Sequence, residues 1–453
     1  MTQKRKFTTD EVPDFSIDKL GQSRHKSPLT ELFAGSDLSK GFVDEKAQNV
    51  YDPRLDSIRL YNDSGEDPPS MEVAGPRQKI FFQPSEVRAA IVTCGGLCPG
   101  LNDVIRAIFM ELHYRYRVNE VLGIRYGYSG LVPRVGLPPI SLTPEIVANI
   151  HRDGGTLLGS SRGPQDSSEI VDFLERMRIN IVFAIGGDGT QRGALSIATE
   201  IERRKLNTGI IGIPKTIDND ISFVERSFGF NTAVSTAKDV LSSGHEEARG
   251  AYNGVAVVKL MGRYSGFIAA MAAVANGDAN FVLVPEIPFD LDGENGFLKI
   301  LEQRLESRKH ALIVVAEGAG QNLLKDASSG SGCDASGNVL LGDIGIYLRD
   351  RIAAHFSSGW HAATVKYIDP SYIIRSSPAN AEDSIFCSRL GRNAVHAAMT
   401  GRTKMVVGLW NNTFTHVPMS AVISRRKQLD PYGPEWLVVL ESTGQPGRMK
   451  DEK

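Results

Sequence analysis

Short apolar segments alternate with segments of helical periodicity along most of this chain, from residue 87 onward. We expect strands at 87–94, 120–125, 181–185, 208–213, 254–260, 280–284, 311–316, 364–367 and 404–410. We expect helices at 103–117, 144–153, 167–177, 190–204, 231–243, 265–276, 296–307, 343–355 and 380–399. Such alternation predicts parallel sheets covered by helices on both faces. Because there are too many units for one sheet, the predicted fold is α/β, with two doubly wound, mostly parallel sheet domains facing each other across a cleft.

The composition argues against several classes of protein. Lys and Arg total 51 and Asp and Glu 53 among 453 residues, so charge gives no reason to expect nucleic-acid or membrane partners. No apolar run approaches the ~20 residues that span a bilayer, and the basic N-terminus lacks the apolar stretch of a secretory signal. The cysteines (Cys94, Cys98, Cys333 and Cys387) are too few for a disulfide framework, and no histidine pair has zinc-type spacing. We expect a cytoplasmic protein without structural metal.

Acidic residues follow two of the predicted strands. The strand 181–185 runs into Gly186-Gly187-Asp188-Gly189-Thr190, and the apolar run at 211–213 leads to Thr216, Asp218 and Asp220. In an extended chain, side chains at every second position share a face, so the last three are predicted to point together. Ligands of open parallel sheets bind outside the carboxyl ends of the strands. Three acids there suggest a Mg²⁺ ligand and a general base, both of which phosphoryl transfer requires.

Two further loops are rich in glycine. Residues 91–102 end a strand and open a helix, and residues 154–163 carry hydroxyl groups and Arg162. Glycines at a helix N-terminus let backbone N–H groups approach a phosphate, and arginine suits the charge of a transferred phosphoryl group. Each loop alone is also compatible with a tight connection or a surface salt bridge, and Asp188-Gly189 with an ordinary turn.

Several motifs together resemble those of the 6-phosphofructokinases. The motifs are Gly187-Asp188-Gly189-Thr190, Pro214-Lys215-Thr216-Ile217-Asp218-Asn219-Asp220, Met261-Gly262-Arg263-Tyr264-Ser265-Gly266 and Ala316-Glu317-Gly318, in the family's order and approximate spacing. The resemblance covers about residues 75–445. Lys259-Leu260-Met261-Gly262-Arg263 and the segment 366–375 are most similar to the ATP-using plant-like and kinetoplastid-like branch. The resemblance implies Rossmann-like domains.

The resemblance also implies a division of the chain. Residues 1–85 would form a partly irregular N-terminal extension and residues 436–453 a C-terminal tail. Residues 86–228 and 376–435 would bind the nucleotide, and residues 229–375 the sugar phosphate.

The resemblance assigns roles to the strand-end residues. Asp218 matches the general base that takes the proton from the sugar 1-hydroxyl, and Asp188 the Mg²⁺ ligand. Asp220 matches a second acid near the metal, while Thr216, Lys215 and Arg162 match groups that hold the reacting phosphoryl group. The nucleotide-phosphate loops correspond to Gly95, Ser161, Arg162, Gly187, Asp188, Gly189 and Thr190.

The remaining matched residues belong to the sugar phosphate. They are Thr216, Ile217, Asp218, Met261, Gly262, Arg263, Glu317, Lys366, Tyr372, Ile373, Ile374 and Arg375. Glu317 would accept hydrogen bonds from sugar hydroxyls. The 6-phosphate would be bound by Lys366, Tyr372 and Arg375. The bacterial short form has a histidine at the position of Tyr372 and supplies an arginine from a neighbouring subunit near the position of Gly254. The chain departs from that form at both places.

The donor of the phosphoryl group depends on two residues. In the family, glycine after the magnesium aspartate accompanies ATP and aspartate accompanies pyrophosphate, because a carboxylate there meets the α-phosphate region of a nucleotide. Gly189 therefore favours ATP. Lys215 stands where pyrophosphate enzymes have lysine, but a lysine does not exclude ATP. We expect Mg-ATP as donor, with pyrophosphate as the alternative.

The expected activity is phosphorylation of fructose 6-phosphate at its 1-hydroxyl, giving fructose 1,6-bisphosphate and ADP. NAD and lipid kinases share Gly-Gly-Asp-Gly-Thr, but those classes predict neither the 216–220 segment nor Met261-Gly262-Arg263. A non-catalytic sensor of sugar phosphate or nucleotide would be expected to have lost Asp188 or Asp218. The family also implies effector regulation and a homo-oligomer, either dimer or tetramer.

Overall fold

A computed structural model describes residues 12–33, 41–324, 332, 339–357 and 362–451. The N-terminal residues 1–11 and Cys333 lie outside the described residues. The chain divides into two compact units. Unit 1 comprises Met1–Lys215, Ile221–Ser227 and Ser384–Arg426, and unit 2 comprises Thr216–Asp220, Phe228–Asp383 and Lys427–Lys453. The prediction of an α/β fold with mostly parallel sheets is confirmed, and each unit contains one such sheet.

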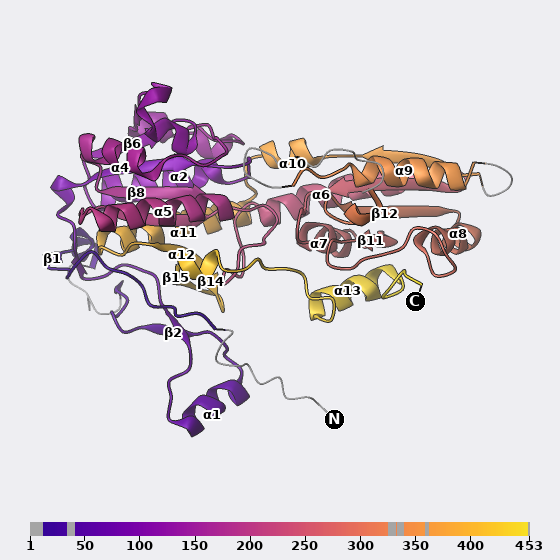
Figure 1. The fold of residues 1–453 in the computed structure, drawn as a ribbon, viewed down its shortest axis with the longest axis horizontal. Coiled ribbons are helices and arrows are strands. Elements are labelled where there is room, and N and C mark those ends of the chain that lie inside the picture. Colours follow the sequence, from indigo (N-terminus) through magenta and orange to yellow (C-terminus); the bar gives the residue numbers. More distant parts are fainter. Residues whose placement is uncertain (1–11, 34–40, 325–331, 333–338, 358–361, 452–453) are drawn as a thin grey trace. The chain divides into compact units, whose positions relative to one another are not determined.

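Unit 1 is built on a seven-stranded sheet of order β15-β14-β9-β8-β5-β6-β7. Figure 1 labels β6, β8, β14 and β15 of this sheet. Five strands run parallel: β5 (Arg88–Thr93), β6 (Glu120–Ile124), β8 (Ile181–Gly186), β9 (Gly209–Pro214) and β14 (Met405–Trp410). Two antiparallel edge strands were not predicted, β7 (Ile140–Ser141) and β15 (Thr413–Pro418). Asn411 and Asn412, both with positive φ, join β14 to β15, and two such residues are the signature of a tight hairpin.

Helices cover the sheet of unit 1. Its core combines residues of the central strands with apolar residues of α4 (Ser167–Arg176) and α5 (Asp188–Arg203). Helices α2 (Leu101–Met110) and α11 (Ala381–Met399) pack closely where Gly391 meets Ala107. Two helices are shorter than predicted. The one expected at 103–117 gives way to a π-helical turn at Glu111–Arg115, and the one at 144–153 is only α3 (Pro144–Val147) and a 3-10 turn.

Unit 2 has a four-stranded parallel sheet of order β11-β12-β10-β13. The strands are β10 (Gly254–Leu260), β11 (Phe281–Leu283), β12 (His310–Ala316) and β13 (Thr364–Ile368). Helix α6 (Phe230–Arg249) packs on one face, where Gly244 lies against Val258. The next helix in the chain is α7 (Phe267–Asn276), which comes after β10. On the other face, α8 (Phe297–Arg308) and α9 (Ile344–His355) form a core with Val255 and Val257. The short α10 (Ser371–Ser376) and α13 (Pro434–Thr443) complete the unit.

The N-terminal segment contains short elements that join unit 1. These are β1 (His25–Lys26), β2 (Gln48–Val50), α1 (Leu55–Ser64), β3 (Ser70–Glu72) and β4 (Lys79–Ile80). Phe15 and Met71 belong to the core of unit 1, and Val73 bridges to Thr415 of β15. The segment is therefore part of the packing of this unit.

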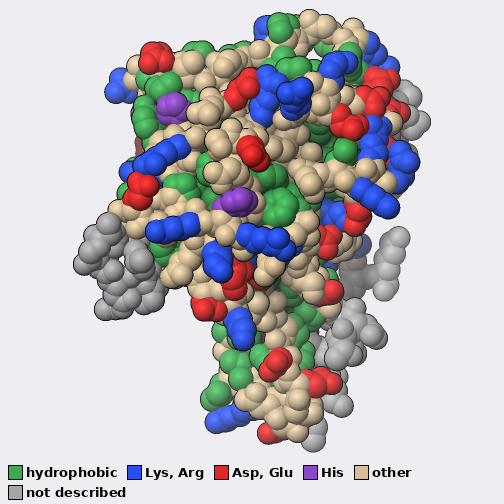
Figure 2. Space-filling model, turned by 90° about the vertical axis from the view of Figure 1, so that its left-hand side faces the viewer, with side chains coloured by type: hydrophobic (Ala, Val, Ile, Leu, Met, Phe, Trp, Pro, Cys, Tyr) green, Lys and Arg blue, Asp and Glu red, His purple; other side chains and the backbone are tan. Residues whose placement is uncertain are grey.

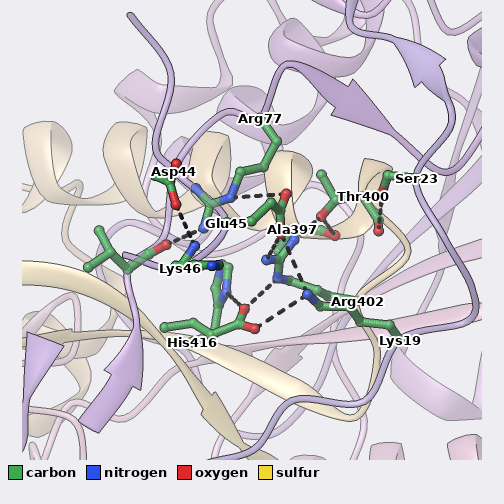
Figure 3. A network of polar contacts seen from close by, with 12 residues as sticks. Lys19, Ser23, Asp44, Glu45, Lys46, Arg77, Ala397, Thr400, Arg402 and His416 are labelled. Atoms are coloured by element: carbon green, nitrogen blue, oxygen red, sulfur yellow. Dashed lines mark hydrogen bonds and ion pairs between the residues drawn. The ribbon is translucent and has the colours of Figure 1, made fainter. Parts of the chain in front are cut away.

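Ion pairs also attach this segment to the unit (Figure 3). The fully buried Arg402 donates from Nε to Glu72, at 2.6 Å, and from Nη2 to Glu45, at 3.1 Å. His416 Nδ1 lies 3.1 Å from Glu72, and buried Arg77 lies 3.5 Å from Glu45. Burial alone would raise the pKa of Glu72, but His416 and Arg402 hold it well below its usual range. Such buried charges are tolerated only because they are paired.

The surface matches the balanced composition. On the face shown in Figure 2, basic and acidic side chains are interspersed. None of the described helices combines the length and the apolar composition needed to span a bilayer.

Candidate active site

In unit 1, two of the predicted phosphate loops lie against each other. Gly95, which follows β5, adopts a φ of 83° that favours glycine. Its N–H donates to the carbonyl of Ser161, at 3.0 Å, and Ser160 Oγ donates to the carbonyl of Gly95, at 2.5 Å. Two segments distant in sequence thus form one glycine- and hydroxyl-lined surface. Arg162 is exposed beside it.

Lys215 reaches this surface from the end of β9. Its side chain is buried, and its ammonium group donates to the carbonyl of Gly96, at 2.6 Å. A Cβ atom on Gly95 would lie 3.3 Å from Lys215 Nζ. The structure therefore places a buried cation beside the glycine loop, where an anionic phosphate group would be attracted.

The third loop opens helix α5. Asp188 is the first residue of the helix, and its carboxylate lies 3.2 Å from Arg192 Nε and 3.5 Å from Arg426 Nη2. A Cβ atom on Gly189 would meet nothing within 4 Å. Thr190 is buried, and Tyr128 donates to its carbonyl, at 2.8 Å. The loop thus presents one partly exposed carboxylate and open space at a helix N-terminus.

A resident metal would need further ligands here. Among the described residues, no group of three His, Cys, Asp or Glu side chains is placed to hold a metal ion. Mg²⁺ differs from zinc in this respect, because it commonly takes one or two carboxylates and completes its shell with substrate phosphates and water. Asp188 fits that mode of binding.

Cys94 and Cys98, between β5 and α2, are both buried. Burial raises the pKa of the Cys94 thiol to about 12, so this side chain is a neutral packing group.

In unit 2, the segment from Thr216 to Asp220 differs from its prediction. We expected an extended chain in which Thr216, Asp218 and Asp220 share a face. The extended conformation was wrong, although the three residues do lie close together. Strand β9 ends at Pro214, and Asn219 has a φ of 56° in a turn. Thr216 Oγ1 donates to Asp220 Oδ1, at 2.7 Å, and the Asp218 N–H donates to Thr216 Oγ1, at 3.2 Å. The turn brings Thr216 and Asp220 together because their side chains hydrogen-bond across it.

Asp218 lies in the most unusual environment of the site. The residue is half-buried, and its Oδ1 atom is buried and accepts no hydrogen bond from any described residue. Burial, followed by the nearby charges of Asp220 and Glu317, raises its pKa to about 7. The Arg375 guanidinium and the N–H of Arg263 partly oppose this increase in pKa. A carboxylate that gains and loses a proton near neutral pH is suited to general-base catalysis.

Arg263, at the end of the Met261–Arg263 turn, and Glu317 lie near Asp218. The Glu317 N–H donates to the carbonyl of Leu260 and the Gly318 N–H to the carbonyl of Gly262. These two hydrogen bonds join the ends of β10 and β12. Gly262 has a φ of 126°, and a Cβ there would lie 2.5 Å from the carbonyl oxygen of Ser265. Only glycine fits this close approach. Met261 and Ile217 are both buried.

The residues of unit 2 that were predicted to bind the 6-phosphate differ in their burial and contacts. The charge of Arg375 lowers the pKa of Asp218, and Arg375 Nε is buried without a hydrogen bond to a described residue. Ile374 is buried and anchors α10. By contrast, Tyr372 is 86% and Ile373 67% exposed. Lys366 lies 4.0 Å from Glu247, with 51% of its side chain exposed.

Sequence reasoning missed the arginines that contact Asp188. Arg192 lies four residues after Asp188, so both lie on one face of the predicted helix, and that spacing could have indicated the pair. Arg426 had no such signal, since it comes from a distant segment.

The model of one protein family, Phosphofructokinase, matches residues 88–398, which is more than half of the chain. The chain belongs to the phosphofructokinase family. Within it, a relative from Borreliella burgdorferi named ATP-dependent 6-phosphofructokinase is 50% identical over 446 residues, covering 97% of this chain and 98% of its own.

The similarity to plant and kinetoplastid phosphofructokinases is confirmed. ATP-dependent 6-phosphofructokinase 1 of Arabidopsis thaliana is 44% identical, covering 98% of this chain and 92% of its own. That of Trypanosoma cruzi is 45% identical, covering 95% and 87%.

Phosphofructokinase structures also share the fold. A crystal structure from Marinobacter aquaeolei, titled pyrophosphate-dependent phosphofructokinase, aligns with a TM-score of 0.65 at 19% identity, covering 81% of this chain and 92% of the other. At this identity the likeness shows the fold alone.

Proposed function

We propose that the chain phosphorylates fructose 6-phosphate at the 1-hydroxyl with Mg-ATP, giving fructose 1,6-bisphosphate and ADP. The observation that carries this proposal is Asp218, a carboxylate with one buried oxygen that accepts no hydrogen bond from a described residue and with a pKa of about 7. The relatives named as ATP-dependent 6-phosphofructokinases, which match nearly the whole chain, support it.

The proposed chemistry is one in-line displacement. Asp218 accepts the proton of the sugar 1-hydroxyl as that oxygen bonds to the γ-phosphorus and the bond from γ-phosphorus to the ADP oxygen breaks. Lys215, Arg162 and Thr216 stabilise the charge on the transferred group. Mg²⁺, held by Asp188 and phosphate oxygens, would neutralise phosphate charge.

Other residues would bind the sugar phosphate. Glu317 accepts its hydroxyls, the Met261–Arg263 turn shapes the pocket, and Arg375 with Lys366 and the 372–374 segment binds the 6-phosphate. Unit 1 is proposed to bind the nucleotide and unit 2 the sugar phosphate.

ATP is the proposed donor because of Gly189. The open space at its Cβ position leaves room for a nucleotide, whereas a carboxylate there would repel the α-phosphate. Lys215, beside the glycine loop, suits either donor. We further propose a cytoplasmic homo-oligomer.

The decisive experiment compares donors. Turnover is measured at saturating fructose 6-phosphate and Mg²⁺ with ATP or pyrophosphate. Turnover with ATP supports the proposal, and turnover with pyrophosphate alone assigns the chain to the alternative donor. Tight binding of fructose 6-phosphate with neither turnover would favour a sensor.

A further inference from the structure

Lys259 occupies a position in unit 2 to which the proposed chemistry gives no role. It lies one residue before the end of β10, on the face where Val255 and Val257 contact α8 and α9. Its side chain is only 13% exposed. A buried ammonium group needs partners, and Lys259 has two carboxylates within 3.0 Å.

The first carboxylate belongs to Asp343 at the start of α9. Lys259 Nζ lies 2.7 Å from Asp343 Oδ2. The other oxygen of Asp343 accepts the N–H groups of Gly345 and Ile346, which caps the helix. Tyr367 of β13 also donates to this carboxylate, at 3.2 Å.

The second carboxylate belongs to Asp369, directly after β13. Because Val258 pairs with Ile368, Lys259 faces the residue at which the chain leaves the sheet, and Nζ lies 3.0 Å from Asp369 Oδ2. Asp369 Oδ1 accepts from the N–H of Ser371, at 3.0 Å, and from its hydroxyl, at 2.5 Å. Asp369 therefore fixes the first residue of α10, the helix that carries Arg375.

We propose that Lys259 is a positioning residue, which holds the start of α10 through Asp369 and so sets the place of Arg375 beside Asp218. α10 has only six residues, too few to be stable in isolation, so its place depends on the buried Ile374 and on the contacts at its start. The electrostatics agree with this arrangement. Burial raises the pKa of both carboxyls, but hydrogen bonds lower it below its usual value, from Lys259 at Asp343 and from Ser371 and then Lys259 at Asp369.

The inference rests on the proposed function, and kinetics of Lys259→Met test it. Arg375 binds the 6-phosphate and lowers the pKa of Asp218, so a displaced Arg375 should change both properties. We expect the KM for fructose 6-phosphate to rise about tenfold, with a smaller change in kcat. The acid limb of kcat/KM should move to higher pH. Lys259→Arg should restore much of both.

The matched control is Lys299→Met on α8, whose partly exposed side chain contacts Glu302; its kinetics should equal those of the wild type. A double-variant cycle with Arg375→Met adds a sharper test. If Lys259 acts through Arg375, Lys259→Met changes little in that background. Should Lys259→Met fail to fold, Asp369→Asn replaces it, since asparagine can still accept hydrogen bonds from Ser371 but loses the ion pair.

A folded Lys259→Met or Asp369→Asn with wild-type KM and an unmoved acid limb overturns the positioning role. Equal effects of Lys259→Met with and without Arg375 overturn it as well. Failure of the proposed function would instead appear in the wild type, as absence of turnover.

Discussion

The two aspartates that follow β8 and β9 look alike in sequence but differ in their surroundings. Asp188, in unit 1, keeps 26% of its side chain exposed and contacts two arginines. Asp218, in unit 2, has one buried oxygen that accepts no hydrogen bond from a described residue, and it is influenced by two further carboxylates. The first lies beside two guanidinium groups, whereas burial and like charges favour protonation of the second.

This difference separates the two proposed roles. A Mg²⁺ ligand must be a carboxylate that stays charged and reachable by solvent and phosphate oxygens. A general base must be able to hold a proton near the working pH. Environment, rather than residue type, therefore distinguishes the roles.

The largest expected effect tests Asp218 as the base. Asp218→Asn keeps the shape of the side chain but cannot accept the proton, so turnover should fall by roughly 100- to 10,000-fold. Calorimetric titration should show fructose 6-phosphate binding largely unchanged. The control is Asp239→Asn on α6, an exposed position of the same unit. Wild-type turnover by Asp218→Asn would remove this residue from the base role.

The next largest effect concerns the donor side of the comparison. Gly189→Asp adds a carboxylate to the loop of Asp188, and kcat/KM for ATP should fall about 100-fold through repulsion of the nucleotide phosphates. Gly189→Ala, for which the structure has open space, should keep ATP activity. If both variants use ATP equally well, the residue does not select the donor.

A smaller effect should appear in the pH profile. Because the pKa of Asp218 is raised to about 7 and the base must be deprotonated, kcat/KM should fall as pH drops through about 7. Glu317→Gln removes one negative charge that raises this pKa, so the acid limb should shift to lower pH by about 0.5–1 unit. Glu306→Gln on α8 serves as the exposed control. A shift to higher pH would contradict the arrangement of charges.

The smallest effect is expected at the Asp188 contacts. Arg192→Gln removes a partly exposed ion pair, and such pairs contribute only about 0–1 kcal/mol. The Mg²⁺ concentration for half-maximal activity should fall less than about threefold, since one competitor for the carboxylate is lost. A tenfold loss of turnover would instead show that Arg192 takes part in the chemistry.

The sequence predicted most of the fold because parallel strands and their helices carry strong periodic signals, as in β8, α5 and β10. It missed β15, a strand of mixed polar and apolar residues that follows the two-residue asparagine turn. It also extended α2 past the point where the π-helical turn begins at Glu111. In the site, family motifs supplied the residues but not their conformation. The turn at Thr216–Asp220 depends on a side-chain hydrogen bond and on the positive φ of Asn219, which strand alternation does not reveal.

The contacts of Arg402 with Glu45 and Glu72 have a practical consequence for anyone who redesigns this chain. A truncated version that starts at the family-matched region, near residue 88, would leave a fully buried guanidinium without either counter-ion. Affinity tags, fusion partners or targeting peptides should therefore be added without removing residues from position 12 onward, because this segment supplies the core residue Phe15 and the carboxylates that pair with buried Arg402.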